Sequence, residues 1–362
     1  MRLSLHSLSC KLVCKLGGML LVLACAACSS SHARYENAAA PHTAQGFQNN
    51  YLEQPMVASL LKWQWERLRD GLPKAPANHY QFPLAQPDLT WLKNNHEKTS
   101  ATWIGHATVL VQLGGVNILT DPIFSERAAP VQWAGPKRKV PPAIALNQLP
   151  HIDLVLISHN HYDHLDRNSV LALNAQPGGA PLFLVPLGLQ QWMHEQGIRN
   201  VQELDWWQGL AFHGLDLHFL PVQHWSARGT HDRFDTLWGG WRVATDAQNK
   251  KPFSFFFAGD TGYSKDFADI YQRFGQVDLA LLPIGAYEPR WFMKPQHVNP
   301  DEAVRIHQDL HARQSLGIHW GTFELSDEAL DEPPRALEKA VNAAGLHANA
   351  FIVLLHGGML HF

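Results

Sequence analysis

The stretch that decides the fold is Ile152-Asp153-Leu154-Val155-Leu156-Ile157-Ser158-His159-Asn160-His161-Tyr162-Asp163-His164. Its first six residues are mostly apolar and rich in β-branched side chains, which is typical of a short buried strand. Four side chains that can bind a metal, His159, His161, Asp163 and His164, follow within six residues. Because α/β sheets usually carry their chemistry at the C-terminal ends of strands, this pattern predicts a metal site. Imidazole and carboxylate together suit zinc, or less often iron or manganese; the alternative is a solvated polar loop.

The composition is that of a globular protein, and it argues against several other classes. The chain has 362 residues, of which 46% are hydrophobic, and a formal net charge of −3. Its apolar runs fall short of the roughly 18 consecutive residues that a membrane-spanning helix needs. The near-neutral charge gives no basic patch, so nucleic acid is not expected as a partner. The length allows about two domains or one large one, and we expect one large domain with extensions.

Residues 1–28 predict a secretory signal peptide, because basic residues precede the apolar run 16–24 and small residues follow it. The end of this segment resembles a bacterial lipoprotein cleavage box, with either Cys25 or Cys28 as the acylated residue. Either choice predicts a lipid anchor in the bacterial cell envelope, and the expected location is the periplasmic side of the outer membrane. The alternative is a cytosolic protein with an apolar N-terminal helix.

The cysteines restrict the chemistry of any metal site in the rest of the chain. All four of them, Cys10, Cys14, Cys25 and Cys28, lie in the leader. The residues that follow therefore have no disulfides and no thiolate ligands. The metal ligands must come from His, Asp or Glu.

Beyond the leader the sequence predicts three parts. Residues 29–50 are rich in Ser, Ala, His, Asn and Gln, which is typical of a flexible tether. Residues 51–98 are expected to form an N-terminal helical extension, and residues 99–362 the main domain.

The extension contains one expected helix, at residues 57–68. The apolar residues that recur at helical spacing in it are Val57, Leu61, Trp65 and Leu68, and Leu60 widens this apolar side. Trp63 falls on the far side of the helix.

The main domain reads as strands and hairpins first, with strands and helices alternating later. Strands are expected at 102–104, 108–111, 116–120, 153–158, 182–185, 216–222, 253–258, 278–283, 315–319 and 351–355. Helices are expected at 186–196, 264–274, 300–312 and 332–344. This order fits an α/β fold in which two sheets are sandwiched by helices.

Three further candidates for metal ligands lie where other expected strands end. His224 follows the strand at 216–222, Asp260 follows the one at 253–258, and His319 ends the one at 315–319. Each is a polar, metal-capable residue that leaves an apolar strand. The alternatives are a histidine satisfied inside the core and, for Asp260, a turn residue that caps a helix.

Taken together, these residues resemble the metallo-β-lactamase superfamily, whose ligand pattern is His-x-His-x-Asp-His followed by a distant His, Asp and His. Within it, longer stretches resemble the family of phospholipases D that hydrolyse N-acylphosphatidylethanolamine. These stretches are Gly105-His106-Ala107-Thr108, Thr120-Asp121-Pro122-Ile123-Phe124, residues 135–138, 158–166, 204–207, 256–263 and 283–294, Gln296-His297-Val298 and residues 318–323. The resemblance covers roughly residues 100 to 360. It implies the αββα sandwich of two mixed β-sheets flanked by helices.

The resemblance also implies a site with two zinc ions. One would be held by His159, His161 and His224, the other by Asp163, His164 and His319, and Asp260 would bridge them. Such a pair lowers the pKa of a bridging water to near neutrality, and the implied reaction is attack of hydroxide on phosphorus. The expected products are N-acylethanolamine and phosphatidic acid.

The remaining site residues are assigned from their positions around these ligands. Asp163 and Asp260 are expected to act in catalysis as ligands before any separate role as a base. His297 is expected to contact the phosphate or to donate to the leaving oxygen, or else it is a loop histidine of local structural importance. The expected substrate contacts are Tyr162, Asn160, Gln296 and His297. Tyr162, Asn160 and His106 are alternatively outer groups that support the ligands.

Other functions stay open at this level, because one fold hosts many chemistries. The alternatives are hydrolysis of another envelope ester, a lactone or a soluble phosphodiester, and a non-catalytic zinc-binding envelope protein. The complete set of seven ligands favours an enzyme. The partners expected are a phospholipid substrate, the membrane surface through the N-terminal anchor and a second copy of the chain in a homodimer.

Overall fold

The computed structural model describes residues 42–43, 46–51, 60–73, 75, 80–245 and 252–362. The predicted signal peptide and the greater part of the predicted tether lie outside these residues. Tyr35–Phe362 forms one compact unit. Among the described residues, no helix has the length and the apolar character needed to cross a membrane.

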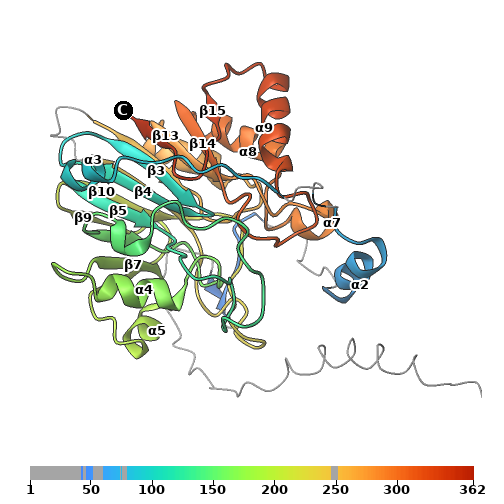
Figure 1. Cartoon of the computed structure of the whole chain (residues 1–362), viewed down its shortest axis with the longest axis horizontal. Helices are drawn as coiled ribbons and strands as arrows, with labels where there is room; N and C mark the ends of the chain where they lie inside the picture. The colour runs from blue at the N-terminus through green and yellow to red at the C-terminus, as the bar shows by residue number, and fades with distance from the viewer. Residues whose placement is uncertain (1–41, 44–45, 52–59, 74, 76–79, 246–251) are drawn as a thin grey trace, which may run out of the picture. The chain divides into compact units, whose positions relative to one another are not determined.

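Two sheets of seven strands each dominate the described residues (Figure 1). The first sheet has the order β16 (Met359–His361), β3 (Ser100–Gly105), β4 (Thr108–Leu113), β5 (Val116–Thr120), β6 (Leu154–Leu156), β7 (Leu182–Pro186) and β8 (Val201–Leu204). The second has the order β15 (Phe351–Ile352), β14 (Gln314–Ile318), β13 (Leu279–Pro283), β12 (Ser254–Phe257), β11 (Gly240–Thr245), β10 (Leu215–Leu220) and β9 (Gly209–Phe212).

Both sheets are mixed and share one plan. In the first, the pairs from β16 to β5 are antiparallel and those from β5 to β8 are parallel. In the second, the pairs from β9 to β12 are antiparallel and those from β12 to β15 are parallel. Parallel strands end at the same edge of a sheet, so polar residues that follow them are brought together there.

The apolar runs are continuous because the strands are buried on both faces. Val109 and Val111 of β4 belong to the core that also contains residues of the second sheet, such as Phe255 and Trp241. Leu110, between them, belongs to the second core, on the opposite face of the first sheet. Val155 of β6 lies in that second core as well.

The α-helices of the described residues are four to twelve residues long, and several of them flank the sheets. They are α2 (Leu60–Asp70), α3 (Leu89–Asn94), α4 (Arg167–Asn174), α5 (Gln190–Glu195), α6 (Asp266–Phe274), α7 (Arg290–Met293), α8 (Pro300–Asp309) and α9 (Glu332–Ala343), with a 3-10 turn at Leu146–Gln148. Figure 1 shows α4 and α5 beside β7, and α8 and α9 beside β14 and β15. The expected αββα sandwich of two mixed sheets is confirmed.

Each strand and helix expected in the main domain is present with ends shifted by a few residues, but some elements were missed. The missed strands are β8, β9, β11 and β16, and the missed helices are α3, α4 and α7. β8 and β9 are four-residue edge strands, and β11 begins at Gly240 and contains Arg242. Such elements lack the apolar run by which a strand is identified from sequence.

The boundary between tether and domain lies earlier than expected. Residues 46–51, which we call the strap, pack on the main domain: Phe47 is buried, and its backbone N–H donates to the Phe234 carbonyl over 2.9 Å. The strap begins with β2 (Gly46–Phe47), paired with β1 (His42–Thr43). Gly46 has φ +122°, and a Cβ there would lie 2.3 Å from the Phe234 oxygen. The prediction that residues up to 50 form a flexible tether is therefore wrong for the strap.

The N-terminal helix buries the side opposite to its apolar side. In α2 the buried side chain is Trp63, which stacks on Phe292 with 4.7 Å between ring centroids. The predicted apolar side, with Leu61, Trp65 and Leu68, faces solvent. Trp63 is held by α7 and by its Nε1–H, which donates to an Asp327 carboxylate oxygen over 2.7 Å.

One buried histidine outside the predicted site makes stability depend on pH. His356 stacks on Trp103, and burial lowers its pKa from 6.5 to about 3. Between these pH values the His356 imidazole is protonated in the unfolded chain and neutral in the folded chain. The free energy of unfolding therefore decreases as pH falls below 6.5. We expect His356→Gln to reduce the loss of unfolding free energy between pH 7 and pH 5 by about 2 kcal/mol. Urea unfolding at a series of pH values measures this. The prediction would be contradicted if the unfolding free energies of the wild type and His356→Gln decreased by the same amount from pH 7 to pH 5.

Candidate metal centre

The seven predicted ligands come from strand ends of both sheets and meet in one place. His159, His161, Asp163 and His164 lie in the loop between β6 and α4. His224 follows β10, Asp260 follows β12, and His319 follows β14. The sheets therefore contribute four and three of these side chains, respectively.

The described residues contain four overlapping groups of metal-capable side chains whose ligand atoms lie within 4.8 Å of one another. The first group is His159, His161 and His224, the second is His106, Asp163, His164 and His319, and the others are Asp121, His159 and His164, and His224, Asp260 and His297. In the first group, Nδ1 of His161 lies 2.7 Å from Nε2 of His159 and 3.3 Å from Nε2 of His224. The second group contains Asp163, His164 and His319, with 3.2 Å between the Nε2 atoms of the two histidines. The first group has the same residues as one ligand set that the resemblance implied, and the second contains the other set together with His106.

Asp260 lies between the two groups. Its Oδ2 is 3.1 Å from Nε2 of His164 and 4.0 Å from Nε2 of His224. Its Oδ1 is 3.1 Å from Nε2 of His319. One carboxylate thus faces ligands of both groups, as a bridging residue must.

The turn that carries Asp260 requires a glycine directly before it. Gly259 has φ +62°, and a Cβ there would lie 2.4 Å from Cβ of Ser158. Without a side chain at 259, the loop after β12 passes directly against the loop after β6. This close approach brings a carboxylate of one sheet to the histidines of the other.

Outer hydrogen bonds fix which nitrogen of each histidine faces inward. Nδ1 of His159 lies 2.9 Å from the Ser158 hydroxyl, Nδ1 of His164 lies 2.6 Å from Asp121, and Nδ1 of His224 lies 2.9 Å from the Gln296 carbonyl. Each of these rings therefore presents Nε2 to the centre. Ligands of metal sites are held in this way, with the second ring nitrogen bonded to a carboxylate or a carbonyl.

The electrostatics of the site favour a cation. Although burial opposes a charge on His164, the carboxylates of Asp260, Asp163 and Asp121 raise its pKa well above the usual value. Burial likewise opposes ionisation of Asp260, yet His164 and the neighbouring rings hold its pKa well below the usual value. A metal ion would take the place of the proton between these groups.

The donor set fits zinc. Imidazole nitrogens and carboxylate oxygens are its ordinary ligands in chains without thiolates at the site. Several donor atoms of the cluster are buried without a hydrogen-bond partner, among them Oδ1 of Asp260 and Nδ1 of His297. Buried polar atoms without partners are costly, and a ligand or ion is one way in which they are satisfied.

Comparison with known families assigns this arrangement. Residues 116–320, which contain all seven side chains, match the family model of the beta-lactamase superfamily domain. The chain belongs to the beta-lactamase superfamily. Among solved structures, this superfamily member is similar to Igni18, a metallo hydrolase from Ignicoccus hospitalis, with a TM-score of 0.55 and 21% identity over 74% of this chain and 99% of that one. That likeness concerns the fold.

Two relatives are similar in sequence to this beta-lactamase superfamily member. The N-acyl-phosphatidylethanolamine-hydrolyzing phospholipase D 1 of Caenorhabditis elegans is 45% identical over 255 residues, 67% of this chain and 70% of that protein. The mitochondrial N-acyl-phosphatidylethanolamine-hydrolyzing phospholipase D of Saccharomyces cerevisiae is 40% identical over 250 residues, 67% of this chain and 52% of that protein. This superfamily member is a metal-dependent hydrolase.

The four residues predicted to contact the substrate differ in how close they lie to the metal-capable cluster. His297 lies at the cluster, with Nδ1 3.8 Å from Oδ2 of Asp260. Gln296 contributes through its backbone, which accepts from His224. The hydroxyl of Tyr162 donates to the Arg228 carbonyl, so that side chain is engaged within the protein. The Asn160 carbonyl accepts from the same arginine, while its side-chain Oδ1 is buried without a partner.

Two residues support the predicted ligands from outside. Asp121 had no predicted role, and His106 was expected only as one alternative. Asp121, which accepts from the Ser158 backbone N–H over 2.7 Å, directly follows β5 and so carries the same strand-end signal as Asp260. His106 lies with Nε2 3.0 Å from Oδ2 of Asp163. Burial lowers the pKa of His106 to about 3, so a neutral ring donates to that carboxylate. His106 is thus placed as an outer group of the ligand set.

A third supporting residue of the superfamily site comes from the strap. The side-chain amide of Asn49 donates to the His224 carbonyl, and its oxygen accepts from the His224 N–H, both over 2.9 Å. The same oxygen accepts from Nε1–H of Trp238 over 3.1 Å. Asn49 therefore forms two hydrogen bonds with the backbone of a predicted ligand that is 175 residues away in sequence.

We expect Asn49→Ala to weaken zinc binding about 10- to 100-fold, the range found when outer partners of metal ligands are removed. It should also cost about 1–3 kcal/mol of stability, because the backbone groups of His224 lose their partners. Competition with a chromogenic chelator measures the affinity. Asn50→Ala is the matched control, since Asn50 donates to Asp266 instead. Equal zinc affinity of the two variants would contradict a positioning role for Asn49.

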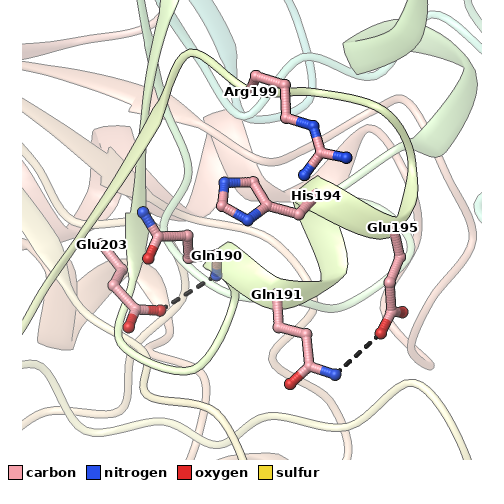
Figure 2. Close-up of a pocket in the computed structure, with 6 residues that line it drawn as sticks. All are labelled: Gln190, Gln191, His194, Glu195, Arg199 and Glu203. Carbon is pink, nitrogen blue, oxygen red and sulfur yellow. Dashed lines mark hydrogen bonds between the residues drawn. The ribbon is translucent and has the colours of Figure 1, made fainter.

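A pocket of about 490 Å³ lies on α5 and β8 (Figure 2). Its lining is polar: Gln190, Gln191, His194, Glu195, Arg199 and Glu203. The Glu203 carboxylate accepts from the Gln190 backbone N–H, and Gln191 donates to Glu195. None of these residues belongs to the metal-capable groups. The pocket is therefore separate from the candidate metal centre.

Proposed function

We propose that the protein is a dinuclear zinc phosphodiesterase of the phospholipase D type, which hydrolyses N-acylphosphatidylethanolamine-type lipids to N-acylethanolamine and phosphatidic acid. The observation that carries the proposal is the pair of adjoining donor groups with Asp260 between them. The similarity to two phospholipases D named for that lipid supports the substrate class.

The two donor groups would each hold one ion: His159, His161 and His224 the first, and Asp163, His164 and His319 the second. When bound, a zinc pair supplies a nucleophilic hydroxide near neutral pH and positive charge opposite phosphate oxygens. Asp260 and Asp163 are ionised at neutral pH, so both act as ligands and carry no proton to donate.

His297 acts from the rim of the cluster. Burial lowers its pKa to about 4, so the ring is neutral at pH 7 and offers one donor and one acceptor nitrogen. Its backbone carbonyl accepts from the Arg290 guanidinium over 2.9 Å, which ties the loop to α7. Its Nδ1, which is buried without a hydrogen-bond partner, would contact a phosphate oxygen or the leaving oxygen of the substrate.

The test combines metal analysis with two substrates. Zinc per chain is measured in the purified protein, and release of N-acylethanolamine is followed from vesicles that contain N-acylphosphatidylethanolamine. Bis(p-nitrophenyl) phosphate serves as a soluble phosphodiester in parallel. We expect two zinc ions and lipid hydrolysis. If the zinc-loaded protein cleaves only the soluble ester, it is a general phosphodiesterase and the lipid substrate is wrong. If it cleaves neither substrate, the whole proposal is refuted.

We propose further that acylation at Cys25 or Cys28 anchors the protein in the bacterial envelope. The support is the sequence of the leader, which lies outside the described residues. Labelling of cells with an alkyne fatty acid should mark the wild type, and Cys28→Ser or Cys25→Ser should abolish the label at the acylated position. A protein that stays unlabelled and in the soluble fraction would refute the anchor.

A further inference from the structure

The exposed side of α2 is the largest departure from ordinary burial in the described residues. The side chains of Leu61, Trp65 and Leu68 are 82%, 63% and 80% exposed. At about 3.6 residues per turn they form one stripe along the helix. Leu60 and Leu72, also exposed, extend the same apolar surface. Contiguous apolar surface of this kind marks a site of contact with a membrane or a protein.

The charges of α2 are sorted around this stripe. By helical spacing, Lys62 and Arg69 border it, and each has an acidic neighbour: Nζ of Lys62 lies 3.7 Å from Glu66, and Arg69 donates to Asp70 over 2.6 Å. Arg67 lies on the far side, over the ring of the buried Trp63. Leucine and tryptophan on one side, with basic residues at its border, is the pattern of helices that lie in the interfacial plane of a bilayer. Because both border cations are paired with acids, the apolar stripe is the feature of α2 that favours contact with a bilayer.

Contacts place α2 next to the metal centre. Trp63 stacks on Phe292 of α7, and Nζ of Lys62 lies 4.1 Å from the ring centroid of Trp291. Figure 1 shows the two helices side by side. α7 leads directly to Gln296 and His297, and the Gln296 carbonyl accepts from the predicted ligand His224. The stripe is thus carried by a helix that packs on α7, and it lies on the side of that helix away from the Trp63 contact.

We propose that the stripe of Leu61, Trp65 and Leu68 docks the protein on a phospholipid surface. The choice of a lipid over a protein partner rests on the proposed function, because a substrate held in a bilayer has to meet the metal centre at that surface. Insertion of the apolar side chains supplies the affinity, so docking occurs on zwitterionic vesicles. Trp291 of α7, 40% exposed, lies at the same edge.

Hydrogen exchange with mass spectrometry tests this on the full chain, because the readout is local to the helix and ignores binding through the leader. Vesicles of phosphatidylcholine, with and without phosphatidylglycerol and free of any N-acylated lipid, are added to the protein. Peptides that cover residues 60–72 should exchange at least about tenfold more slowly with vesicles, while peptides from α9 stay unchanged. No slowing in α2 would overturn the proposal.

A pair of matched variants separates docking from folding and catalysis. Leu61→Glu/Leu68→Glu should remove the vesicle-dependent protection of α2 and weaken docking about 100-fold or more. Leu355→Glu/Phe362→Glu, which alters two exposed apolar residues elsewhere, should leave both unchanged. Hydrolysis of bis(p-nitrophenyl) phosphate should be equal in all three proteins.

The outcomes distinguish this proposal from the preceding one. Protection of α2 by vesicles in a protein that cleaves no lipid would refute the lipid hydrolase and keep the docking surface. Protection that grows with protein concentration in the absence of vesicles, and a mass in light scattering that falls in Leu61→Glu/Leu68→Glu, would assign the stripe to a second copy of the chain and overturn docking.

Discussion

Asp260→Asn is expected to lower bound zinc from two ions per chain to one or fewer and to reduce phosphodiester hydrolysis by more than about 100-fold. Loss of an outer partner alone costs about 10- to 100-fold, and Asp260 faces both donor groups directly. The amide keeps the size of the side chain but removes its negative charge. The carboxylate that balances His164 and His319 is then lost, and a cation at either group is less stable.

Zinc is measured by inductively coupled plasma mass spectrometry after gel filtration, and hydrolysis with the soluble phosphodiester. The matched control is Asp301→Asn, an exposed aspartate in the first turn of α8. It should retain wild-type zinc and activity. Full zinc occupancy together with full activity in Asp260→Asn would show that the residue is a turn aspartate and not a bridging ligand.

Asp121 is expected to matter nearly as much, although it faces away from the centre of the site. It is fully buried, and it accepts from the Ser158 N–H and faces Nδ1 of His164. Asp121→Ala should destabilise the protein by about 3–5 kcal/mol, the cost of removing one partner of a buried charged pair. It should also weaken zinc binding about 10- to 100-fold, because the His164 ring loses its orientation.

Asp121→Asn separates these two effects. Residue 121 has φ +29°, a conformation that asparagine tolerates better than alanine does. The amide oxygen can still accept from Ser158, so most of the stability should return, whereas the missing charge leaves zinc binding weak. Thermal unfolding with and without a chelator measures both quantities. An alanine variant as stable as the wild type would contradict the structural role of Asp121.

The sequence predicted that the seven candidate ligands lie close together, because each of them carries a local signal. His159 to His164 are close together in the chain, and His224, Asp260 and His319 each follow an apolar strand. Since strand ends meet at one edge, proximity follows from the strand assignment. Asp121 had the same signal after β5. This signal alone does not identify Asp121 as a site residue, because a single aspartate after a strand is also an ordinary turn residue.

The features that the sequence did not predict depend on distant partners. Asn49 acts on backbone groups of His224, which leave no trace in the identity of residue 224. The orientation of α2 depends on Phe292, which lies in a four-residue helix that was itself missed. Amphipathic spacing shows which residues share a side of a helix. Which side is covered is decided by the rest of the molecule.

The grip of Asn49 on His224 redefines the smallest piece of this chain that can work as an enzyme. A fragment starting at residue 60 would keep all seven donor residues and both sheets, and by sequence it would pass as the complete hydrolase domain. It would lack the strap, and with it the partner of both backbone groups of His224. Expression designs, protease cleavage sites and fusion points should therefore be placed before Gly46, since a cut after it separates the catalytic domain from part of its own active-site wall.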